Sequence, residues 1–105
     1  MDELSDHEQQ ILGELNEQQA QMLVEAEAIG GGPIMRVDVQ QRMHPIVRIG
    51  ATTFLDESDP ELSGAQANED LDGLMAVRAV EPMGKEVYRL TVLGIRLARH
   101  LKQRE

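Results

Sequence analysis

The chain has 105 residues and no cysteine, so we expect one domain with a modest core and neither disulfides nor thiolate metal sites. Its net charge of −9 opposes phosphate binding on average, and its two aromatic residues, Phe54 and Tyr88, argue against base stacking on an aromatic platform. No apolar run is long enough to span a membrane, and the acidic N-terminus is unlike a secretory signal, which favours a cytoplasmic protein.

The charge is unevenly distributed along the chain. Residues 1–35 carry −8, residues 36–55 carry +2, residues 56–72 carry −7 and residues 73–105 carry +4. A polyanion would therefore be attracted to the C-terminal third and repelled by two other blocks. An acidic, lysine-poor composition also suits a salt-accumulating organism, because screening at about 1 M salt limits charge effects to about 3 Å.

Residues 5–29 are predicted to form one long first helix. Ser5 and Glu8 fit a capping box, and the glycines and proline of residues 30–33 end the helical pattern. A helix of this length spans roughly 37 Å, more than so small a domain needs. It either packs only on its own core or reaches another subunit. The second alternative predicts a homodimer whose interface includes an apolar stripe of Ile11, Leu15, Met22 and Ile29.

The segment after the glycines is less regular. Ile34–Val37 is predicted to form a short strand, and Asp38 is placed to cap a short helix over Val39–His44, which Pro45 would end. Ile46–Leu55 is apolar and contributes to the core, as either a strand or an irregular loop.

A further helix is expected over Glu61–Leu74, with Pro60 at its first position and Ser58 or Asp59 as its cap. Its apolar positions include Leu71 and Leu74, which we expect to be buried.

A β-hairpin and a last helix follow. Pro82–Lys85 has the composition of a tight turn, in which glycine would accept a positive φ. Alternation in Glu86–Leu90 directs Tyr88 inward and Arg89 outward. Thr91 is placed to cap the last helix.

The C-terminal part resembles the winged helix–turn–helix family. The resemblance covers residues 61–101 and is carried by Leu71, Leu74, the hairpin, and Tyr88-Arg89-Leu90-Thr91 followed by Gly94. It implies an α+β, mainly α fold: a single winged-helix domain over 1–105 with a long N-terminal helix and a C-terminal helix after the wing. The hairpin would be the wing, residues 34–37 would pair with it, and residues 61–74 would be the recognition helix. The poor helix at 39–44 departs from the family.

The resemblance implies nucleic-acid contacts at Arg78, Lys85 and Arg89, because wings in this family often touch phosphate or the minor groove. Alternatively, Arg78 and Arg89 pair with the chain's own carboxylates. Gln66 and Asn68 of the recognition helix could read adenine edges, but its carboxylates would repel phosphate. Two functions stay open: a transcription regulator that binds duplex DNA through its wing, and an acidic protein-interaction module, in one form a mimic of nucleic acid.

Catalysis, metal binding and cofactor binding are not expected. His7, His44 and His100 lack metal-ligand spacing, and the acidic residues of 56–59 lack the pattern of a calcium loop. The glycines at 30–32 are not followed by the lysine of a phosphate-binding loop.

Overall fold

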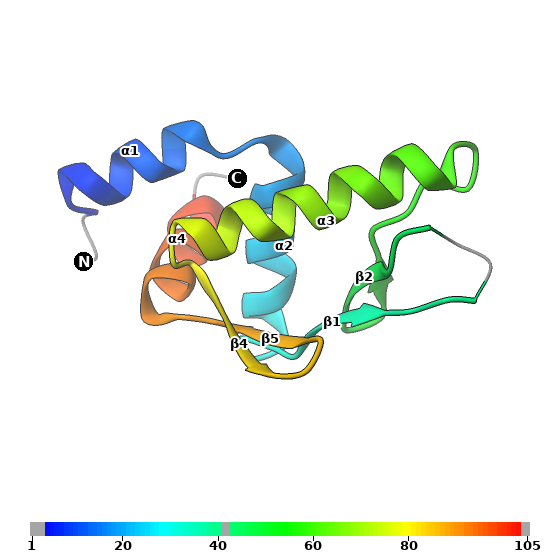
Figure 1. Cartoon of the computed structure of the whole chain (residues 1–105). Coiled ribbons are helices and arrows are strands. Elements are labelled where there is room, and N and C mark those ends of the chain that lie inside the picture. Colours follow the sequence, from blue (N-terminus) through cyan, green and yellow to red (C-terminus); the bar gives the residue numbers. More distant parts are fainter. Residues whose placement is uncertain (1–3, 41–42, 104–105) are drawn as a thin grey trace.

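The computed structural model describes residues 4–40 and 43–103 and shows an α+β fold, about half of it helical (Figure 1). Its elements, in chain order, are α1 (Asp6–Glu14), α2 (Glu17–Ala28), β1 (Ile34–Val37), β2 (Ile46–Ile49), β3 (Thr52–Thr53), α3 (Pro60–Ala76), β4 (Val80–Gly84), β5 (Val87–Leu90) and α4 (Val92–Gln103).

The strands form one antiparallel sheet in the order β3-β2-β1-β5-β4. Strand β1 lies in the middle, since Ile34 pairs with both Ile49 and Tyr88. Helices α2, α3 and α4 pack on one side of this sheet, and Figure 1 shows the strands below the helices. The largest fully buried side chains fill the space between: Met22, Leu23, Ile34, Val47, Ile49, Leu71, Leu74 and Leu97.

The single long helix expected over residues 5–29 is wrong, because the chain breaks into α1 and α2 at Leu15. Leu15 is extended, with ψ 139°, and Asn16 caps a second helix by accepting a hydrogen bond from the backbone N–H of Gln19 at 2.7 Å. The Gln19 side chain accepts in return from the Asn16 N–H, which completes a second capping box. The Ser5–Glu8 capping box is confirmed.

The break redistributes the apolar stripe that we expected at a dimer interface. Ile11 and Met22 are buried in the chain's own core, with exposed fractions of 4% and 0%, and Leu15 is half-buried. Ile29 is 41% exposed. In this conformation only Leu15 and Ile29 are accessible to a second copy, and the homodimer stays a prediction.

The short helix expected over Val39–His44 is not formed by residues 39, 40, 43 and 44, and residues 41 and 42 lie outside the described residues. The next segment, which could have been a strand or a loop, is a β2–β3 hairpin that turns at Gly50, with φ 58°. Alternation places Val47 and Ile49 in the core and Arg48 in solvent. The described residues of this segment therefore form a loop followed by a β-hairpin, and they do not form the middle helix of a winged helix.

The C-terminal hairpin forms, with a shifted turn. The pattern of residues 75–81 also suits a strand, but Met75 and Ala76 belong to α3, and β4 begins at Val80. The turn lies at residues 85–86, where Glu86 rather than Gly84 has a positive φ, of 62°, because a bulge between Pro82 and Gly84 moves the register. The burial of Tyr88 and exposure of Arg89 are confirmed, as are the pairing of β1 with the hairpin and the Thr91 cap on α4.

An ion pair connects α1 to α4, and it predicts that the stability of the fold depends on pH. Arg96 Nε donates to Glu8 Oε2 at 2.9 Å, and this bond, with the Ser5 backbone N–H, holds the pKa of Glu8 below its ordinary value of 4.5. A lowered pKa in the folded state stabilises the fold above pH 4.5, and this stabilisation is lost as the pH falls through the folded-state pKa.

Glu8→Gln is therefore expected to lower the Tm at neutral pH by an amount that shrinks as the pH falls below 4.5. Glutamine still completes the capping box, so the change isolates the ion pair. Glu14→Gln removes a charge from the same helix at a side chain without an ion pair to residues 4–40 or 43–103, and is the control. A Tm difference for Glu8→Gln that stays constant across this pH range would contradict the assignment.

Candidate functional site

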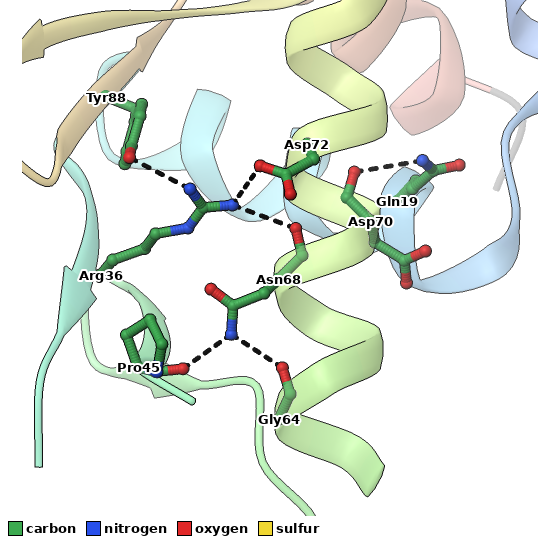
Figure 2. A network of polar contacts seen from close by, with 8 residues as sticks. All are labelled: Gln19, Arg36, Pro45, Gly64, Asn68, Asp70, Asp72 and Tyr88. Atoms are coloured by element: carbon green, nitrogen blue, oxygen red, sulfur yellow. Dashed lines mark hydrogen bonds and ion pairs between the residues drawn. The ribbon is translucent and has the colours of Figure 1, made fainter. Parts of the chain in front are cut away.

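Arg36 points from β1 toward the helices and clamps α3 to the sheet (Figure 2). Its guanidinium donates to Tyr88 Oη at 3.2 Å, to the Asn68 carbonyl at 3.0 Å and to Asp72 Oδ1 at 2.5 Å. Burial lowers the pKa of Arg36, but the hydrogen bond and charge of Asp72 more than compensate and raise it. This arginine is thus an internal cation and not part of a phosphate-binding surface.

Asn68 is also used inside the protein. Its side-chain amide donates to the carbonyls of Pro45, at 2.7 Å, and Gly64, at 2.8 Å, as Figure 2 shows. It therefore joins α3 to the start of β2, and with its N–H groups engaged there Asn68 does not have the free amide that reading an adenine edge would need. Gln66 does remain exposed. The exposed residues of α3 include no base: Glu61, Leu62, Gln66, Glu69, Asp72 and Ala76.

The three cations expected to contact nucleic acid are spread along the C-terminal hairpin. Arg78 lies in the turn before β4, Lys85 at the opposite end of the hairpin, and Arg89 in the middle of β5. Arg89 Nε donates to Glu81 Oε1 on the paired strand at 2.7 Å, so for this residue pairing with the chain's own carboxylate is confirmed. Arg78 and Lys85 form no ion pair with residues 4–40 or 43–103.

A surface that the sequence did not indicate lies on the other side of the sheet, away from the helices. Strand alternation points Met35 and Val37 of β1 into solvent, each with 38% of its surface exposed. Their cross-strand partners point the same way. We call this surface the open face and define it by Ile46 and Arg48 of β2, Met35 and Val37 of β1, and Val87 and Arg89 of β5.

The open face has an apolar centre between two arginines. Met35 is the direct cross-strand partner of both Arg48 and Val87, and Val37 is the partner of Ile46. Side chains on directly opposite residues are in contact range, so the four apolar residues form one continuous strip. Arg48 flanks this strip on β2 and Arg89 flanks it on β5. The signal in the sequence was the strand Ile34–Val37, in which both outward residues, Met35 and Val37, are apolar.

The edges of the sheet are poorly suited to adding another strand. Edge strand β4 contains Pro82, which has no N–H to donate, and a bulge, and edge strand β3 has only two residues. Short, bulged or proline-containing edges oppose edge-to-edge pairing. A partner of this sheet would therefore contact its face rather than extend it.

Within residues 4–40 and 43–103, no three His, Asp or Glu side chains gather closely enough to hold a metal ion. Among the same residues no helix is both long enough and apolar enough to cross a membrane. Comparisons of the chain with protein-family models, with curated proteins and with solved structures find no match. These comparisons identify no winged-helix family, so the resemblance to one rests on the sequence pattern alone.

Proposed function

We propose that this protein is an interaction module that binds another protein through the open face. The observation that carries the proposal is the solvent-exposed strip of Met35 and Val37 between Arg48 and Arg89. Protein interfaces are enriched in methionine and arginine, are depleted of lysine, and have few charges at their centre. A complementary partner presents an apolar centre with acidic residues around it.

The distribution of charge over the molecule favours an acidic protein that binds the open face and opposes its binding to the acidic side of α3. The exposed side of α3 carries Glu61 and Glu69, together with Asp72, which is paired with Arg36. The open face carries two arginines, and the acid beside it, Glu81 of β4, is paired with Arg89. An acidic partner is thus attracted to one side of the molecule and repelled by the other, which fixes its orientation.

Hairpin-mediated DNA binding is the second candidate, in keeping with the winged-helix resemblance. It is supported by the pairing of β1 with the hairpin and by the cations Arg78 and Lys85, which form no ion pair with residues 4–40 or 43–103. Each phosphate contact contributes a salt-dependence slope of about 0.9, so two contacts give weak binding that the acidic α3 further opposes. Lys85→Ala would flatten that slope by about one unit, and Glu69→Gln would strengthen binding by removing repulsion.

A matched pair of surface variants tests the first proposal. Met35→Asp places a charge in the centre of the open face, and Leu62→Asp places one on α3 at a residue that is 56% exposed. Tagged wild-type and variant chains are used to recover bound proteins, and each partner is then purified and titrated. We expect at least one partner that binds wild type and Leu62→Asp alike but binds Met35→Asp at least about tenfold more weakly, a loss of about 1.4 kcal/mol.

Partners that bind Met35→Asp and wild type equally would contradict the open face as the contact surface. A parallel titration with random duplex DNA at low and moderate salt tests the second candidate. Salt-dependent affinity that Lys85→Ala reduces and Met35→Asp leaves unchanged would favour the hairpin instead.

A further inference from the structure

We propose that a hollow beside Arg89 receives an apolar side chain from an acidic linear segment of the partner, an inference that rests on the proposed function. The hollow has a volume of about 280 Å³ and is lined by residues 30–33, Met83, Arg89, Leu90 and Ile95. It adjoins the open face, because Arg89 belongs to both. A partner segment that lies across the open face can therefore place a side chain in the hollow while it stays in contact with the sheet.

The glycine segment that forms one wall is held in place by backbone hydrogen bonds. Leu90 N–H donates to the Gly31 carbonyl and Gly31 N–H donates to the Ala26 carbonyl, both at 2.8 Å. Gly30 and Gly31 have φ of 88° and 99°, a conformation that disfavours other residues. A Cβ on either would meet no atom within 4 Å, so the missing side chains leave open space. The wall is thus pre-formed, which lowers the entropic cost of binding.

The volume of the hollow suits a single side chain of a partner better than a whole small-molecule ligand. Sites that enclose small-molecule ligands measure about 300–1,000 Å³, and this hollow lies just below that range. It is also open to solvent along the side shared with the sheet, where Arg89 and Met83 are exposed. Pro33 before β1, Met83 of β4 and Ile95 of α4 supply apolar contacts from three sides, as needed to hold a branched aliphatic or aromatic group.

The charge at the rim selects an acidic neighbour for that apolar residue. Arg89 uses its Nε for Glu81, and its terminal N–H groups make no hydrogen bond to residues 4–40 or 43–103. With the side chain 57% exposed, these groups are accessible to a carboxylate, for which guanidinium is a geometrically matched donor. The occupant is therefore a segment with an aspartate or glutamate close to its apolar anchor.

The test uses the full chain and short random peptides displayed on phage as the probe. We expect the selected peptides to share an apolar residue flanked by Asp or Glu. Synthetic copies of these peptides, titrated by fluorescence anisotropy, should bind Met83→Ser and Arg89→Gln about tenfold more weakly than wild type. Glu81→Gln should bind them more tightly, because it releases Arg89 and removes a competing carboxylate.

Two control variants change residues outside the hollow. Val92→Ser alters an apolar residue on α4 that is 76% exposed, and Arg78→Gln alters a cation at the far end of the hairpin. Both should bind the peptides like wild type. All five variants change exposed or half-buried side chains, and circular dichroism and a thermal melt confirm that each is folded before titration.

Several results would overturn the inference, and they are distinguishable from failure of the proposed function. Selection of no peptide, or of basic peptides, excludes an acidic segment. Selected peptides that Met35→Asp weakens but Met83→Ser and Arg89→Gln do not would place the anchor on the open face alone, so that the proposed function stands and the hollow is excluded. Self-association that Met83→Ser and Arg89→Gln abolish would identify a second copy of this chain as the occupant.

Discussion

Replacing Gly94 with alanine is expected to destabilise the protein by at least about 3 kcal/mol, the upper end of the range for overpacking. An added Cβ would lie 2.0 Å from the Ala79 carbonyl oxygen and 3.0 Å from its carbon. Both are backbone atoms, and that oxygen already accepts a hydrogen bond from Thr91 N–H at 3.0 Å. The Thr91 hydroxyl also donates to the Arg78 carbonyl and accepts from Gly94 N–H, so neither segment can move independently.

Gly13→Ala is the matched control, since Gly13 lies on the exposed side of α1 with no atom within 4 Å of an added Cβ. In an exposed helix this change stabilises by about 1 kcal/mol, because alanine loses less backbone entropy than glycine. The same substitution should thus have opposite signs in two helices, measured by urea unfolding. A Gly94→Ala variant as stable as wild type would show that α4 does not pack against the turn at residues 78–79.

Gly94 shows what sequence reasoning could and could not reach. It was noticed only as part of a pattern that resembles a family, whereas the structure supplies a steric reason for it. Features that depend on neighbours in the chain were predictable: the Ser5 capping box, the Thr91 cap and the alternation around Tyr88. Such features arise from interactions within a few residues, which a sequence displays directly.

The break between α1 and α2 was missed although its signal is local. Asn16 and Gln19 have the spacing of a capping box, but the apolar residues on either side continue the helical period and suggested one helix. Met22 then packs in the core and not on a partner. A capping box inside a periodic segment is stronger evidence for a helix boundary than the periodicity is for one continuous helix. Its side chains bond backbone N–H groups that lack a partner only at the start of a helix.

The open face could not be predicted because it depends on which strands become neighbours. Met35, Arg48 and Val87 are far apart in the chain and meet only through the register of β2, β1 and β5. Charge counted along the sequence misleads for the same reason. Arg36 contributes to the positive block at residues 36–55, yet its charge is neutralised by the ion pair with Asp72. Arg48 of the same block is exposed at the surface.

Leu74→Ala is the second substitution expected to have a large effect. Leu74 is fully buried at 0% exposure in the C-terminal half of α3, the helix that packs against α2, β2 and β4. Truncation removes its apolar contacts and leaves a cavity, because the clamp of Arg36 on Asn68 and Asp72 prevents α3 from moving inward to fill it. The loss of unfolding free energy should be on the order of 2–5 kcal/mol.

Leu62→Ala on the same helix provides the comparison, because Leu62 is 56% exposed and the chemical change is identical. Its effect should stay within about 0.5 kcal/mol, as is usual for surface substitutions. Urea unfolding of both variants measures the difference directly, provided that the slope of free energy against denaturant is unchanged. Since domains of this size are stable by only about 5–15 kcal/mol, Leu74→Ala would remove a large share of the total. A loss below about 0.5 kcal/mol would instead place Leu74 at the surface and the inner side of α3 away from the sheet.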